Sequence, residues 1–90
     1  MPEDDMRKRA DWMVIADDPI LETVRDFVAT SPQEVAETTG LSREHTNRRL
    51  VKLYEHQLLD RPQRGLYRIT TEAEQYLDED LDASTLEKRD

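Results

Sequence analysis

Residues 40–70, "GLSREHTNRRLVKLYEHQLLDRPQRGLYRIT", decide the fold of this 90-residue chain and also hold most of its positive charge. The segment 42–68 contains seven of the thirteen Lys and Arg residues against three acidic residues, a local balance of +4. The rest of the chain has six basic and eighteen acidic residues, and the net charge is −8. A cationic segment on an anionic body predicts a face that binds a polyanion.

This segment predicts a helix followed by a β-hairpin. Ser42 is expected to cap the helix, after Gly40 has ended the helix before it. The apolar stripe of the new helix follows helical spacing: Leu41, Thr46, Leu50, Leu53 and Tyr54. Beyond Gln57 the pattern changes to the short alternating runs "LLDR" and "LYRI", joined by "PQRG", which is typical of a hairpin turn.

Two shorter helices are expected upstream. In "DDPILETVRDFVAT", Asp18 is predicted as N-cap and Pro19 as the first helical residue. The buried face of this helix is expected to contain Ile20, Leu21, Val24, Phe27 and Val28. In "SPQE", Ser31 and Glu34 form a capping box around Pro32, and the inward residues that follow are Val35 and Ala36.

A last helix is expected in "TTEAEQYLDEDL", where Thr71 and Glu74 are predicted to form a second capping box. Its inner side is expected to contain Ala73, Tyr76, Leu77 and Leu81. Residues 83–90 are predicted to be a flexible tail. The order helix, short helix, Gly turn, longer helix, hairpin, helix is the winged helix-turn-helix plan, a mainly α fold with a small β-hairpin, here over residues 17–82.

The N-terminal arm, residues 1–16, has two interpretations that both depend on Trp12. In the first, Trp12 closes one end of the core. In the second, residues 3–16 form a dimerisation arm that packs on a partner subunit. The second is favoured, because apolar residues make up only 36 % of the chain and one subunit has a thin core.

In this plan the third helix projects into the major groove of double-stranded DNA and the hairpin lies beside it. With Thr46, Leu50 and Leu53 inward, the outward arc contains Arg43, Glu44, Asn47, Arg48 and Val51, flanked by His45 and Lys52. The predicted DNA-contacting residues are Ser42, Arg43, Glu44, His45, Asn47, Arg48, Lys52, Arg61, Arg64 and Arg68.

These residues have different expected roles. Arg48 is suited to guanine and Asn47 to adenine, while Glu44 can accept from cytosine or simply cap the helix. Ser42 suits a phosphate oxygen, and Arg64 is the first wing candidate because it lies beside Gly65 at the tip. Arg49 borders the buried stripe and is interpreted as a structural ion-pair partner. Arg68 can contact DNA or pair with an acid across the hairpin.

Several other functions are not expected. The chain has no Cys, no phosphate-binding Gly-rich loop and no Ser-His-Asp set, so neither an enzyme nor a cofactor is predicted. His45 and His56 would lie about 16 Å apart on one helix, too far to share a metal. No apolar run is long enough for a membrane span or a secretion signal, which favours a cytoplasmic protein. Nothing indicates a small-molecule effector.

The stretch "SPQEVAETTGLSREHTNRRLVKLYEHQLLDRPQRGLYRITTEAEQYL", with the upstream "DWMVIADDPILETV", resembles the phage phi-H repressor-like family of halophilic archaea and their viruses. The resemblance covers about residues 10 to 82. Its pattern of "GLS", "RRL" and "LYRIT" is shared with many winged-helix regulators. Gln57 departs from the family, which usually has Gly there, so a looser or longer junction is expected.

The resemblance implies a dimeric, sequence-specific DNA-binding transcriptional regulator, usually a repressor, and here a homodimer on an inverted repeat. The alternative is a winged-helix protein-protein interaction module of transcription or replication machinery. Independently, the ten Arg and three Lys among twenty-one acidic residues are typical of a protein that works in molar salt. The other interpretation of that composition is an ordinary acidic domain.

Overall fold

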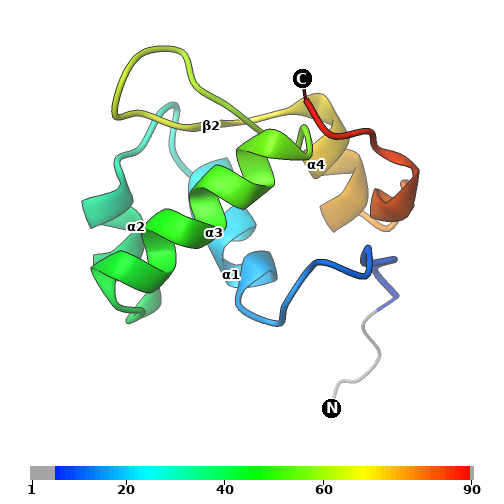
Figure 1. Ribbon diagram of the computed structural model, residues 1–90, viewed down its shortest axis with the longest axis horizontal. Helices are drawn as coiled ribbons and strands as arrows, with labels where there is room; N and C mark the ends of the chain where they lie inside the picture. Colours follow the sequence, from blue (N-terminus) through cyan, green and yellow to red (C-terminus); the bar gives the residue numbers. More distant parts are fainter. Residues whose placement is uncertain (1–5, 90) are drawn as a thin grey trace.

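The computed structural model describes residues 6–89 and confirms the predicted fold class: helices around a two-stranded antiparallel hairpin (Figure 1). The elements are α1 (Asp17–Arg25), α2 (Pro32–Thr39), α3 (Arg43–Glu55), β1 (Leu59–Asp60), β2 (Arg68–Ile69), α4 (Thr71–Leu77) and a 3₁₀ turn (Ala83–Thr85). Within these residues no helix combines the length and the hydropathy that a membrane crossing requires.

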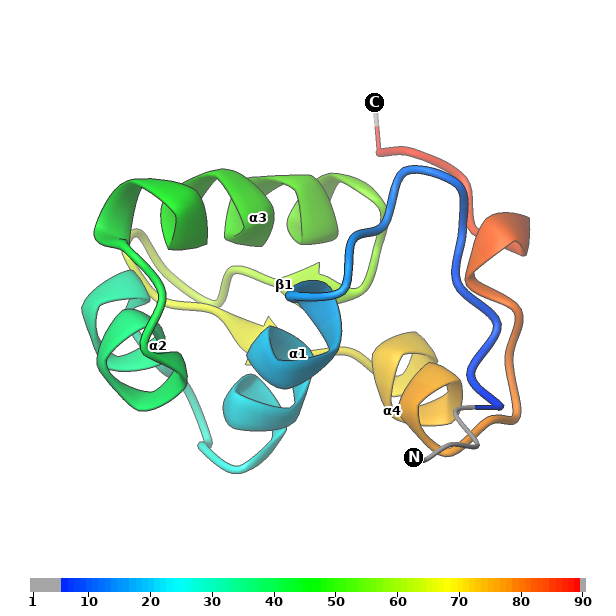
Figure 2. The ribbon, with the colours of Figure 1, turned by 90° about the horizontal axis from the view of Figure 1, so that it is seen from below.

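The core draws side chains from every helix and from the hairpin, which explains why one small domain holds together without disulfides. Helix α3 runs across the molecule with α1 and α2 packed beneath it, and α4 lies at the far end (Figure 2). The largest apolar side chains that are fully buried are Ile20, Leu21, Val24, Val35, Leu50, Leu53, Leu58, Leu59 and Tyr76.

The beginning of α1 differs from the prediction. Asp18 is not the N-cap: the helix begins at Asp17, two residues before the predicted first residue Pro19, and its N-cap Ala16 has no capping side chain. Both Asp17 and Asp18 are buried, and the Asp17 carboxylate accepts a hydrogen bond from the Val14 backbone N–H at 3.1 Å. The two carboxylates lie within the first turn because their main partners are arginines elsewhere in the fold.

The end of α1 also differs. Ile20, Leu21 and Val24 are fully buried as predicted, but Phe27 is 39 % exposed and Val28 is 89 % exposed. The helix ends at Arg25, so the helical period no longer applies to the two residues predicted beyond it.

The capping signals around the helix-turn-helix are confirmed. Ser31 and Glu34 form the reciprocal capping box of α2, and Gly40 ends that helix with a φ of 80°. The Ser42 side chain accepts a hydrogen bond from the His45 backbone N–H at 3.0 Å and so caps α3. Hydrogen bonds from Ser31 and Thr30 lower the pKa of the Glu34 carboxyl.

The end of α3 depends on Gln57, which has a φ of 70° in the left-handed region. The Leu58 N–H donates to the Leu53 carbonyl at 3.0 Å, and the Gln57 N–H donates to the Tyr54 carbonyl at 3.1 Å. This pattern closes the helix as a Gly-type C-cap does. The looser or longer junction expected from the absence of Gly is therefore not found; Gln57 adopts the conformation that Gly would.

Gln57→Gly is expected to raise the free energy of unfolding by about 0.5–1 kcal/mol, because it relieves a left-handed conformation that costs a side-chain-bearing residue about 1–2 kcal/mol. The gain is reduced by the greater backbone freedom of Gly when unfolded and by loss of the Gln57 Nε2 hydrogen bond to the Glu87 carbonyl, 2.9 Å long. Urea unfolding in molar KCl would measure it. Gln57→Ala loses the same amide but keeps the strain, so equal stability of the Gly and Ala variants would contradict the expectation.

Helix α4 begins at Thr71, the residue predicted as its cap, so its N-cap lies one residue earlier than predicted. Thr70, not Thr71, is the N-cap: its hydroxyl accepts from the Ala73 N–H at 3.0 Å and donates to the Gln57 carbonyl at 2.9 Å. Thr70 is buried where β2 ends, whereas Thr71 is exposed, so only Thr70 reaches both partners. The predicted box of Thr71 and Glu74 is therefore wrong, although Ala73, Tyr76 and Leu77 are buried as expected.

The two terminal segments lie side by side on the domain (Figure 2). The Ala83 N–H donates to the Lys8 carbonyl at 2.9 Å, and Ala83 is buried. Further along, the Arg89 guanidinium donates to the Leu59 carbonyl and the Asp60 carboxylate, each at 3.0 Å. The segment predicted as a flexible tail therefore packs on the body over residues 83–89. Residues 1–5 and 90 of the predicted arm and tail lie outside the described residues.

Candidate nucleic-acid interface

One side of α3 is anchored in the core, and the opposite side faces solvent. Thr46, Leu50 and Leu53 are fully buried. The outward residues are all exposed and define what is called here the outward face: Arg43, Glu44, Asn47, Arg48 and Val51. His45 and Lys52 flank this face and are half-buried. The sequence prediction of which side of the helix projects is confirmed.

The outward face begins at a helix N-terminus. Ser42 is exposed, and its hydroxyl oxygen is occupied by the His45 N–H while its own proton remains available to an acceptor. The unpaired backbone N–H groups of the first turn carry partial positive charge. This end of α3 is therefore suited to a phosphate oxygen.

Arg48 is held only loosely. Its Nη1 atom lies 3.1 Å from Glu44 Oε2, one turn earlier on the helix, and the two side chains are 64 % and 84 % exposed. A pair so exposed contributes little to stability, about 0–1 kcal/mol. The guanidinium is therefore free to exchange Glu44 for an acceptor on a base edge.

Arg49 has the opposite character. Its guanidinium donates to both carboxylate oxygens of Asp17, at 2.9 Å from Nε and 2.8 Å from Nη2, and Nη2 also donates to the Trp12 carbonyl at 3.2 Å. The Asp17 side chain is completely buried. Hydrogen bonding to Asp17 raises the pKa of Arg49. Arg49 is therefore the structural ion-pair partner that the sequence predicted, and it ties α3 to α1.

Trp12 packs within its own subunit. Its ring stacks on His56 with centroids 4.1 Å apart and planes 20° apart, and it lies against the core. Burial, followed by the charges of Lys52 and Lys88, lowers the pKa of His56. Trp12 therefore closes one end of the core, as in the first interpretation, while the dimerisation arm of the second stays a prediction.

The loop between β1 and β2 projects beside α3 as a wing (Figure 1). Arg64 is exposed near its tip, next to Gly65, whose φ of 81° allows the turn. Arg61 is also exposed, but its guanidinium carbon lies 5.0 Å from the centre of the Tyr54 ring and 5.7 Å from that of Tyr67. Cation–π contacts of this kind hold Arg61 at the base of the wing.

Arg68 lies directly across the hairpin from Asp60. Asp60 nevertheless forms its ion pair with Arg89, at 3.0 Å. Within residues 6–89 Arg68 has no ion pair and is exposed. Arg89 was not predicted to contribute here, because the last residues carry no pattern that places them.

Asp17 was also missed as the partner of Arg49, although two adjacent acids at a helix start and an Arg beside an apolar stripe are a usable signal.

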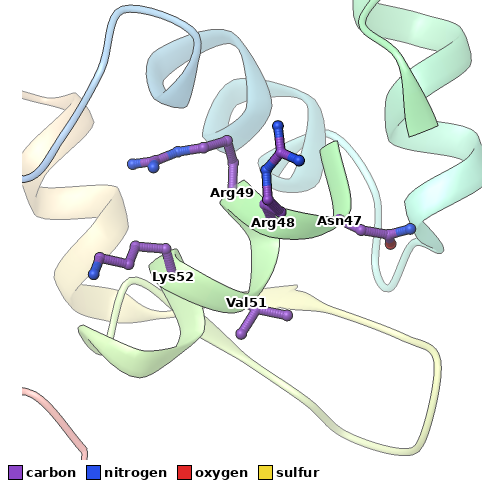
Figure 3. Close-up of a pocket in the computed structure, with 5 residues that line it drawn as sticks. All are labelled: Asn47, Arg48, Arg49, Val51 and Lys52. Atoms are coloured by element: carbon purple, nitrogen blue, oxygen red, sulfur yellow. The ribbon is translucent and has the colours of Figure 1, made fainter. Parts of the chain in front are cut away.

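The predicted contact residues thus form two groups on neighbouring elements. Ser42, Arg43, Glu44, Asn47 and Arg48 follow α3, with His45 and Lys52 at its edges, and Arg61, Arg64 and Arg68 follow the wing. Five residues of α3 line one open hollow: Asn47, Arg48, Arg49, Val51 and Lys52 (Figure 3). An α-helix fits the major groove of DNA.

Comparison with known proteins agrees with this geometry. The family of winged helix-turn-helix phage repressors matches residues 6–89. A solved structure, that of the PhiH1 repressor-like protein from Haloarcula marismortui, is 37 % identical, with a TM-score of 0.83 over 94 % of this chain and 99 % of that one. No curated protein matches the chain. On the strength of a match that spans all the described residues, the chain belongs to the winged helix-turn-helix phage repressor family.

Proposed function

We propose that the protein is a sequence-specific transcriptional regulator, a repressor, that binds double-stranded DNA through α3 and the wing. The observation that carries this proposal is the outward face. It places Arg43, Asn47 and Arg48 on a helix that its other side anchors firmly, on a chain whose net charge is −8. Segment 42–68, which contains this helix and the wing, has a local balance of +4, and cationic side chains on a projecting helix and wing are suited to the phosphates of DNA.

The regulator acts as a homodimer on an inverted repeat. Two recognition helices must be related by a two-fold axis to enter successive major grooves. Residues 1–16 are proposed to contribute to this contact. Among the described residues of that segment, Met6 is 66 % exposed, Ile15 is 79 % exposed and Val14 is 41 % exposed, which leaves apolar surface for a partner.

Selection from a random DNA duplex library in molar KCl tests the proposal. The expected product is an inverted repeat with half-site centres about 10 bp apart, or a multiple of that spacing. Sedimentation at micromolar concentration should show a dimer. Failure to select any duplex would exclude DNA binding and would favour the alternative, a protein-protein interaction module. A selected site without two-fold symmetry, with a monomer in solution, would overturn the dimer alone.

Arg48→Ala is expected to relax sequence preference and to weaken binding to the selected duplex by about 1–3 kcal/mol, because a guanidinium that reads guanine is lost. Arg64→Ala should weaken all duplexes by a similar factor, since a wing residue contacts the backbone. Fluorescence polarisation with selected and scrambled duplexes separates the two effects. Arg25→Ala is a matched charge control: Arg25 is exposed and pairs with Asp78 at 3.4 Å, away from α3. Normal binding by both the Arg48 and Arg64 variants would show that the assigned face is wrong.

A further inference from the structure

Val51 is an apolar residue on the most polar side of α3. Its side chain is 41 % exposed, and it lies one turn beyond Asn47 and Arg48 on the outward face. With Asn47, Arg48 and Lys52 it lines the open hollow on α3 (Figure 3). The other outward residues, Arg43, Glu44, Asn47 and Arg48, are all charged or carry an amide.

The fold does not require valine at this position. Leu50 and Leu53, on either side in sequence, are fully buried and fill the core beneath α3. A β-branched residue in an exposed helix position is also less favourable than Ala, by up to about 0.7 kcal/mol, because its χ1 rotation is restricted. Neither core packing nor helix propensity therefore accounts for Val51.

The major groove offers one apolar group, the C5-methyl of thymine. We propose that Val51 determines specificity by contacting a thymine methyl in the operator; this inference rests on the proposed DNA-binding function. Its methyl groups are held in one dominant rotamer, so they meet a fixed methyl without much further loss of side-chain freedom. A charged or amide side chain at the same place would find no hydrogen-bond partner in a methyl group.

Helix geometry indicates which thymine is read. Val51 lies three residues beyond Arg48, an axial advance of about 4.5 Å along α3. Successive bases of one strand are about 3.4 Å apart. The thymine contacted by Val51 should therefore lie one step from the base pair that Arg48 reads, once in each half-site.

The test uses the selected duplex with each thymine replaced singly by deoxyuridine, which removes only the C5-methyl group. Wild-type protein should bind one substituted duplex per half-site about 4-fold more weakly, the effect of burying one methyl. Val51→Ala should bind the thymine and deoxyuridine forms of that duplex equally. Circular dichroism verifies that this exposed substitution leaves the fold intact.

Three outcomes would overturn the inference. The first is wild-type binding that is unchanged by every deoxyuridine, while Arg48→Ala still relaxes preference; the proposed function would then stand. The second is a sensitive thymine whose effect persists in Val51→Ala, which would assign the methyl to another residue. The third is the failure to select any duplex, which would remove the proposed function together with this inference.

Discussion

Arg49→Leu is expected to lower the free energy of unfolding by about 3–5 kcal/mol, the cost of removing one partner of a buried ion pair. Asp17 has no exposed side-chain surface, and Arg49 supplies two of its hydrogen bonds, at 2.8 and 2.9 Å. Without Arg49 the carboxylate has only the Val14 N–H among the partners described above. The Trp12 carbonyl loses a donor as well.

Urea unfolding in molar KCl measures this effect, and the neighbouring residue offers a matched control. Arg48→Leu removes the same charge from the same helix, but Arg48 is 64 % exposed, so a change below about 1 kcal/mol is expected. The double variant Asp17→Asn, Arg49→Leu should recover much of the loss, because no unpaired charge remains buried. Equal losses for Arg48→Leu and Arg49→Leu would show that the pair does not anchor α3.

Lowering KCl from molar concentration to below about 0.2 M is expected to loosen the fold and the dimer. The net charge is −8, and Asp78, Glu79 and Asp80 form one run of exposed carboxylates after α4. Repulsion among such groups is screened over about 3 Å at 1 M salt and over about 10 Å at 0.1 M. At molar KCl, by contrast, specific DNA binding should persist. The affinity should fall only slowly as the salt concentration rises, because screening also weakens the repulsion between DNA and the acidic body.

Circular dichroism and fluorescence polarisation across a KCl series provide the measurement. Each phosphate contact alone would contribute a log-log slope of about −0.9, and the cationic segment offers few contacts per subunit. A stable fold in low salt, combined with steep loss of operator binding by about 0.5 M KCl, would contradict adaptation to high salt. It would leave the winged helix-turn-helix architecture intact.

The features predicted correctly from sequence are those set by neighbours in the chain. Ser31 with Glu34, Gly40 and Ser42 act through backbone groups three or four residues away, so their patterns alone locate α2 and α3. Helical spacing predicted which residues of α3 are buried, and the residues on the opposite side were therefore predicted to form the outward face. Arg49 could be recognised as structural because it borders the buried stripe.

The errors arose where distant residues decide the local structure. Asp18 resembles an N-cap, yet its carboxylate accepts from the Tyr76 hydroxyl at 2.7 Å and pairs with Arg9 at 2.9 Å. Thr70 caps α4 through the local Ala73 N–H, but what distinguishes it from Thr71 is its burial and its hydrogen bond to the Gln57 carbonyl, thirteen residues earlier. The placement of Arg89 likewise depends on Tyr54, Leu59 and Asp60, and no local pattern predicts contacts across such separations.

The contrast between Arg48 and Arg49 has a consequence for how such a regulator can evolve. Adjacent arginines on one helix have different roles: Arg48 is exposed and pairs loosely with Glu44, and Arg49 pairs with the buried Asp17. Under the proposed function, substitutions on the outward face should therefore alter which operator is bound with little effect on stability, because surface substitutions away from buried partners rarely change the free energy of unfolding by more than about 0.5 kcal/mol. Under the proposed function, the DNA sequence that is recognised can change through Arg43, Asn47, Arg48 and Val51 while Arg49 stays unchanged.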